Sequence, residues 1–182
     1  MAAKVIYLAG VPASGKSSIF REIREELFDG AREFRSGKCR GIEKGPYRML
    51  GVFDGSSFEG TDGLSWTVID DALRYISEQR RSAARVVIFV EGDRLFNERF
   101  MAEAGATLYI IDAAPAVLAA RHAQRRDTQS KEWLRRQRAK VERIAAKYNA
   151  PRIRNHIEED RRRIVAHLVQ QARLYAELGI NG

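Results

Sequence analysis

The sequence predicts an α/β fold in which a parallel sheet is covered by helices on both faces, with a β-hairpin insertion and a helical lid. A glycine-rich loop at 10–17 joins an apolar run to a helical pattern. Continuous apolar runs at 85–91 and 107–112 are typical of strands buried on both faces. Helical patterns alternate with these runs, which favours parallel strands. We expect one domain over residues 1–182, with ligands bound at the carboxyl ends of the strands.

The loop at 10–17 reads GVPASGKS and has the pattern of a phosphate-binding loop. Its two glycines allow a tight turn whose N–H groups point at one anion, and the helix that follows directs its positive end at the same place. Lys16 can reach the β- and γ-phosphates of a bound nucleotide, and the Ser17 hydroxyl can ligate Mg²⁺. The residues expected to bind the nucleotide are Gly10, Ala13, Ser14, Gly15, Lys16, Ser17 and Ser18.

The next part of the chain predicts a helix that ends near residues 29–30 and two strands, 34–42 and 47–53, around a turn at 43–46. This hairpin should lie on the substrate side of the sheet. Residues 54–64 are too rich in glycine for regular structure, and a loop this long is usually functional or mobile.

Ser65 is a good N-cap for the next helix, whose apolar face contains Ile69, Ala72, Leu73 and Ile76. The strand at 85–91 follows, and its carboxyl end carries Glu91, Gly92, Asp93 and Arg94. A short helix around 96–103 precedes the strand at 107–112.

From Pro115, which suits a first helical turn, the pattern is helical. We expect helices over 116–126 and 131–148, with a polar break between them, a chain break at 149–151, and a last helix over about 157–178. The expected lid is the region around 121–135.

The formal net charge is +8, and residues 121–163 contain fifteen Lys/Arg against six Asp/Glu. This segment therefore carries the whole excess, either as solvated helix faces or as a surface for an anionic substrate. Cys39 is the single cysteine, which excludes an intramolecular disulfide and a zinc site built from cysteines. No apolar stretch approaches the ~20 residues of a membrane span and no signal peptide is apparent, so we expect a cytoplasmic protein without a membrane partner.

With these features in hand, the chain resembles the P-loop nucleoside and nucleotide kinases over nearly its full length. Within that group, three segments are similar to those of bacteriophage P-loop kinases, among them the 5-hydroxymethyluracil DNA kinases of phages with hypermodified thymidine. The segments are 58–65 (FEGTDGLS), 91–96 (EGDRLF), and the pair Arg121-His122 with 125–130 (RRDTQS).

The resemblance implies a P-loop kinase-like fold and an ATP- and Mg²⁺-dependent transfer of phosphate to the 5-hydroxymethyl group of uracil in DNA. By position, Thr61 and Asp62 would face the acceptor, and Glu91 and Asp93 would lie near metal or substrate, beside Arg94. The lid would be formed by Arg121, Arg125 and Arg126. A kinase of a free nucleoside or nucleotide is the alternative acceptor assignment, and a nucleic-acid-binding P-loop ATPase without an acceptor is the alternative class.

An alcohol acceptor must lose a proton, and an aspartate accepts it in hydroxyl-directed kinases. Asp62 is the first candidate for this base and Asp54 the second. Phe58, in the glycine-rich loop, could stack on a base. We expect Tyr47, Phe53 and Trp66 in the core by default.

Overall fold

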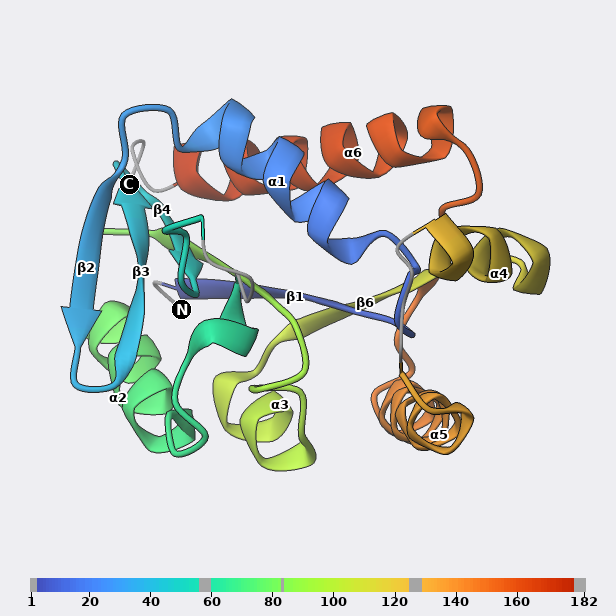
Figure 1. Cartoon of the computed structure of the whole chain (residues 1–182). Coiled ribbons are helices and arrows are strands. Elements are labelled where there is room, and N and C mark those ends of the chain that lie inside the picture. The colour runs from blue at the N-terminus through green and yellow to red at the C-terminus, as the bar shows by residue number, and fades with distance from the viewer. Residues whose placement is uncertain (1–2, 56–59, 83, 125–128, 179–182) are drawn as a thin grey trace.

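The computed structural model describes residues 3–55, 60–82, 84–124 and 129–178. Its sheet has the strand order β2-β3-β4-β5-β1-β6-β7 (Figure 1). The strands are β1 (Ala3–Ala9), β2 (Arg32–Ser36), β3 (Cys39–Lys44), β4 (Tyr47–Leu50), β5 (Val86–Glu91), β6 (Thr107–Asp112) and β7 (Arg152–Arg154). The helices are α1 (Lys16–Leu27), α2 (Ile69–Arg81), α3 (Glu98–Ala104), α4 (Pro115–Gln124), α5 (Lys131–Lys147) and α6 (Glu158–Glu177), with a 3-10 turn η1 (Thr61–Gly63).

The predicted fold class is confirmed. Strands β4, β5, β1, β6 and β7 pair in parallel, and the β1–β5 register runs from Ala3 opposite Val86 to Leu8 opposite Glu91. The carboxyl ends of β1, β5 and β6 therefore meet at one edge, and the loop after β1 leaves the sheet there. The antiparallel hairpin strands β2 and β3 extend the sheet beyond β4.

Helices cover both faces of the sheet (Figure 1). The alternation of side chains along β1 divides the core, because Tyr7 and Val5 pack on the face of α2 and α3 while Ile6 and Leu8 pack on the face of α1 and α6. Strand β5 is buried throughout, as its continuous apolar run predicts. None of the helices in the described ranges is both long enough and apolar enough to span a bilayer.

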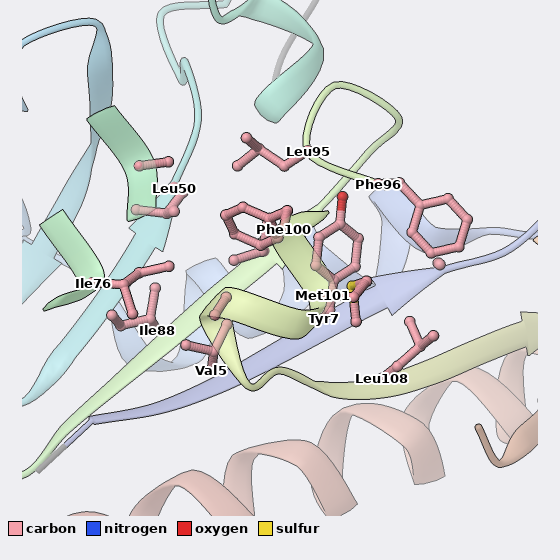
Figure 2. Close-up of a cluster of buried hydrophobic side chains, with 14 of the residues drawn as sticks. Val5, Tyr7, Leu50, Ile76, Ile88, Leu95, Phe96, Phe100, Met101 and Leu108 are labelled. Atoms are coloured by element: carbon pink, nitrogen blue, oxygen red, sulfur yellow. The ribbon is translucent and has the colours of Figure 1, made fainter. Parts of the chain in front are cut away.

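An aromatic cluster of the core supports the edge where the strands end. The Tyr7 ring packs against Phe96 and Phe100, with ring centroids 5.6 and 5.9 Å apart (Figure 2). The buried Tyr7 hydroxyl donates a hydrogen bond to the Gly92 carbonyl oxygen at 2.9 Å. The core thus fixes the turn that follows β5.

The expectation of one strand over 34–42 is wrong. Residues 32–44 form two strands, β2 and β3, because Gly37 adopts a left-handed φ of 60° that closes a two-residue turn between Ser36 and Cys39. The other expected turn is present, with Gly45 at φ 52° just before Pro46. The hairpin therefore includes one more strand than the apolar pattern indicated.

Two further expectations need correction. Helix α2 begins at Ile69 rather than after Ser65, because residues 65–68 form a turn in which the Ser65 carbonyl accepts the Val68 N–H at 3.2 Å. Strand β7 was not expected, because its three residues carry no apolar run. It is ordered by pairing with β6, and the Asn155 N–H donates to the Asp112 carbonyl oxygen at 2.8 Å just beyond it.

Candidate active site

The phosphate-binding loop lies between β1 and α1 and depends on its glycines. Gly15, at φ 96°, precedes the first residue of α1, and Ala13 also has a positive φ of 63°. A Cβ on Gly10 would lie 2.3 Å from the Ile111 carbonyl oxygen, and one on Gly15 would lie 2.3 Å from Asn155 Nδ2. Only glycine fits at these two positions, because the loop packs directly against β6 and the residue after β7.

Lys16, at the end of the loop, reaches back to the residues at its start. Its ammonium donates hydrogen bonds to the carbonyl oxygens of Gly10 at 2.9 Å and Val11 at 3.2 Å. Ser14 is fully buried, and its hydroxyl makes no hydrogen bond within the described part of the chain. Ser14 contributes to the loop through its backbone, because its carbonyl oxygen accepts hydrogen bonds from Asn155 Nδ2 and Arg121 Nη1.

A cavity of about 410 Å³ connects this loop with the acidic turn after β5 and with η1. The residues lining it on the loop side include Gly10, Ala13, Lys16 and Ser17, whereas the expected nucleotide-binding residues Ser14, Gly15 and Ser18 are not among its lining residues. On the other side the cavity is lined by Asp62, Glu91, Gly92, Asp93 and Arg94. The structure therefore brings together three segments that the sequence placed in the site separately.

Glu91 is buried at the end of β5, with 5% of its surface exposed. Burial raises the pKa of its carboxyl to about 7; the neighbouring Asp62 adds to this effect, and Lys16 opposes it. A carboxyl group with a pKa near neutrality can hold or release a proton at physiological pH.

Asp62 connects η1 to the turn after β5. Its Oδ1 accepts hydrogen bonds from the N–H groups of Asp93 at 2.9 Å and Arg94 at 3.3 Å, and its carbonyl oxygen accepts one from Arg94 Nη2 at 2.9 Å. The turn can approach this closely because residue 92 is glycine, where a Cβ would lie 2.5 Å from Thr61 Oγ1. Thr61 does not face the acceptor as expected, because it is fully buried and does not line the cavity. Its hydroxyl donates to the Glu91 carbonyl oxygen and so joins η1 to the end of β5.

The remaining acidic candidates are placed differently. Asp93 is ion-paired with Lys140 of α5 at 2.6 Å, and its second oxygen accepts from Gln137 at 3.3 Å. This contact brings α5 against the acceptor side of the cavity. Asp54 does not line that cavity; it lines a separate one of about 300 Å³ beside Phe53 and Arg40.

The oxygen-bearing side chains of the cavity fit a Mg²⁺ ion that is bound mostly by phosphate oxygens of the substrate. Within the described residues, no group of three or more His, Cys, Asp or Glu side chains could hold a metal ion on its own. Mg²⁺ commonly takes only one or two protein ligands and completes its shell with phosphate oxygens and water. Ser17 and the carboxylates of Glu91 and Asp93 lie around the same cavity and would hold the ion there.

Arg121 contacts the phosphate-binding loop rather than the cavity. Its Nη1 donates to the carbonyl oxygens of Ala13 at 3.3 Å and Ser14 at 3.1 Å, and its Nη2 donates to that of Asn155 at 3.0 Å. Arg121 therefore ties the back of the loop to the residue after β7. Arg125 and Arg126, the other expected lid arginines, and Phe58 lie outside the described residues.

Sequence reasoning missed Asn155 and Trp66. Asn155 is 2% exposed and donates through Nδ2 to the Ser14 carbonyl oxygen at 2.7 Å, yet nothing in its local sequence marks it. Trp66 was expected in the core but is 81% exposed and lines the cavity. Its position directly after the segment FEGTDGLS was the available signal.

This fold and this site, a lysine-bearing phosphate loop facing a carboxylate-lined cavity at the ends of parallel strands, define a P-loop kinase. The family model described as P-loop Nucleotide Kinase3 matches residues 1–163. The chain belongs to that family.

Solved structures of similar fold include a shikimate kinase from Aquifex aeolicus and a gluconokinase from Sinorhizobium meliloti 1021. Each is 17% identical to this chain, with a TM-score of 0.46. The alignment with the first covers 92% of this chain and 98% of that one, and the alignment with the second covers 100% and 98%. No curated protein matches the chain.

Proposed function

We propose that the protein is an ATP-dependent phosphotransferase acting on an alcohol, and that its acceptor is the 5-hydroxymethyl group of 5-hydroxymethyluracil in DNA, as a step in phage thymidine hypermodification. The observation that carries the kinase assignment is the single cavity shared by Lys16, Ser17, Asp62 and Glu91. It offers a place for a phosphate beside a place for an acceptor.

The loop would bind the ATP phosphates. Phosphoryl transfer is catalysed mainly by positioning and by charge stabilisation. Lys16 would exchange its two carbonyl partners for β- and γ-phosphate oxygens, while Ser17 would hold Mg²⁺, which neutralises charge on those oxygens. Arg121 and Asn155 would keep the loop in shape from behind.

An acidic side chain would take the proton of the acceptor hydroxyl. Asp62 remains our first candidate, because hydrogen bonds from two backbone N–H groups fix one of its oxygens while the residue lines the cavity. Glu91 is a second candidate, because its pKa of about 7 suits proton transfer near neutral pH. Asp54 is less well supported, since it lines a different cavity.

Support for DNA rests on the similarity of the three phage-like segments and on cations along α5. Lys131, Arg135 and Arg138 are exposed, recur at helical spacing and form no ion pair with any described residue. Such a stripe would increase the affinity for a polyanion, because neutralising its phosphates releases condensed counterions.

A free hydroxymethyl nucleotide is the second candidate acceptor, and ion pairing within the basic segment favours it. Many cations of residues 121–163 are paired with acidic side chains of the same chain, which leaves less charge for a polyanion. The paired residues are Arg136, Lys140, Arg143, Lys147, Arg152, Arg154, Arg161, Arg162 and Arg163.

The test is transfer of labelled phosphate from ATP to three acceptors at increasing salt: DNA containing 5-hydroxymethyluracil, unmodified DNA, and the free hydroxymethyl nucleotide. We expect labelling of the modified DNA alone, weakening as salt rises. Labelling of the free nucleotide alone would replace the DNA assignment with the nucleotide one. Labelling of DNA that ignores salt would show that the cations of α5 do not contribute to DNA binding. Phosphate release without any labelled acceptor would contradict a kinase.

A further inference from the structure

Both tryptophans of this chain line the cavity that contains Lys16 and Asp62. Trp66 lies in the turn before α2, and Trp133 lies in the first turn of α5, where its N–H is capped by Ser130 Oγ at 3.2 Å. The two elements are far apart in the sequence. Their convergence on one polar cavity gives it aromatic walls, to which Phe96 also contributes.

Trp66 is held in place although it is exposed. The guanidinium of Arg94 lies 3.4 Å from the centroid of the indole, and Arg94 is itself anchored to the Asp62 carbonyl oxygen. Arg94 Nε and Nη1 are buried and make no hydrogen bond within the described ranges, so the cation–π contact is their compensating interaction. The indole is therefore ordered before any ligand arrives.

The other face of this indole is open. With 81% of its surface exposed and one face covered by a guanidinium, Trp66 leaves a large apolar ring against solvent. A partner that enters the cavity and covers this ring would remove apolar surface from water, which is favourable. The partner must be flat to match the ring, and it must reach a cavity that also contains carboxylates and a phosphate-binding lysine.

We propose that Trp66, fixed by Arg94, is the stacking platform for a planar nucleobase that carries the acceptor hydroxyl, and that Trp133 is a second aromatic contact of the same base. This inference rests on the proposed kinase function and names the chemical class of its acceptor: a heteroaromatic base rather than a sugar acid or a polyol. It assigns to Trp66 the role that the sequence suggested for Phe58.

Binding can be measured without catalysis, because the chain contains two tryptophans and both line the cavity. The variant Trp133→Phe reports on Trp66 alone, and Trp66→Phe reports on Trp133 alone. Each is titrated with 5-hydroxymethyl-2′-deoxyuridine monophosphate, with a single-stranded oligonucleotide containing that base, and with gluconate as a non-aromatic hydroxyl compound. We expect both base-bearing ligands to quench the emission of Trp66 and gluconate to leave it unchanged. Equal responses to all three, or none, would overturn the platform.

Kinetics give the second measurement. Replacing Trp66 by Ala should raise the Kd and KM of the acceptor about 5- to 100-fold, the usual range for one base–aromatic stack. The KM for ATP should stay unchanged, and Trp66→Phe should recover most of the loss. Leu178→Ala is the matched control, since Leu178 is also an exposed apolar side chain at 64% but does not line the cavity.

These outcomes separate the two claims. An unchanged acceptor KM in Trp66→Ala, with phosphate still transferred, would refute the platform and leave the kinase function intact. Quenching of Trp66 by the base-bearing ligands, with no transfer to any acceptor, would refute the kinase function and leave the platform intact. Trp66→Ala removes the ring that the Arg94 guanidinium contacts, so we expect a small fall in its melting temperature. Trp66→Phe keeps a ring at this position and separates a loss of stacking from a loss of stability.

Discussion

At the scale of single residues, Lys16 has the clearest role, because its ammonium spans the phosphate-binding loop. We expect Lys16→Ala to lower turnover about 10²- to 10³-fold at saturating Mg·ATP, because the variant lacks the positive charge that Lys16 places beside the transferred phosphate. Lys44→Ala is the control, because Lys44 donates to the Asp29 carbonyl oxygen far from the site. Turnover of Lys16→Ala near that of the control would refute the role.

Asp62 and Glu91 compete for the role of base, and two isosteric variants distinguish them. If Asp62 accepts the proton, Asp62→Asn should reduce transfer about 10²- to 10⁴-fold with little change in ATP affinity. Glu91→Gln should then retain more activity than Asp62→Asn. The reverse order, measured by single-turnover transfer at neutral pH, would assign the proton to Glu91.

Glu91 also makes stability depend on pH. Its pKa is about 7 in the folded protein and ordinarily 4.5, so the folded state holds a proton that the unfolded chain has lost between these values. The free energy of unfolding therefore falls by up to about 3 kcal/mol as pH rises from 4.5 to about 7. Glu91→Gln cannot ionise, so its free energy of unfolding should not show this fall.

The check is thermal unfolding of the wild type and Glu91→Gln without nucleotide or metal. The variant should gain melting temperature over the wild type as pH rises from about 4.5 to about 7. A difference between the two proteins that stays constant over this range would show that Glu91 titrates normally.

At the scale of elements, α4 and the end of β7 hold the phosphate-binding loop. Arg121 links the carbonyl oxygens of Ala13 and Ser14 to that of Asn155. Lysine at this position keeps the charge but lacks the planar fork that reaches all three. We expect Arg121→Lys to weaken Mg·ATP binding about tenfold and to lower kcat, because the loop loses its shape.

Calorimetric titration with Mg·ATP measures this effect. Arg99→Lys is the matched control, since Arg99 of α3 is exposed and pairs only with the surface acids Asp70 and Glu103 among the described residues. Its ATP affinity should equal that of the wild type. Equal affinities in both variants would show that the loop does not need Arg121.

At the scale of the whole molecule, the distribution of unpaired charge decides how DNA would bind. On α5, Lys131, Arg135 and Arg138 share a face, while Trp133 and Gln137, which line the cavity, lie on another. A strand contacting both would have to pass around this helix. The basic stripe would then strengthen binding without reading the acceptor base.

The double variant Arg135→Gln/Arg138→Gln should therefore weaken binding of modified DNA and reduce the slope of log affinity against log salt by up to about 2. The control is Arg162→Gln/Arg163→Gln on α6, which removes the same charge from residues already paired with Glu158 and Glu159. Equal slopes in the two double variants, measured by fluorescence anisotropy, would indicate that α5 does not contact DNA.

The sequence by itself determined the phosphate-binding loop, the central strands and most helices. Strand β6 lies at 107–112 as expected, and α1, α4, α5 and α6 match their predicted ranges to within about three residues. These features can be predicted because glycine spacing, continuous apolar runs and helical periodicity involve only residues that are close together in the sequence.

Only the tertiary structure decided β7, the partners of Arg121 and Asn155, and the exposure of Trp66. Strand β7 is ordered by β6, Asn155 meets Ser14 across 141 positions of sequence, and Trp66 is held outside the core by Arg94. Such contacts depend on which segments the sheet brings together at its carboxyl edge. The residues next to each of these positions in the sequence do not indicate its distant partner. The sequence therefore predicts Trp66 in the core, although it lines the site.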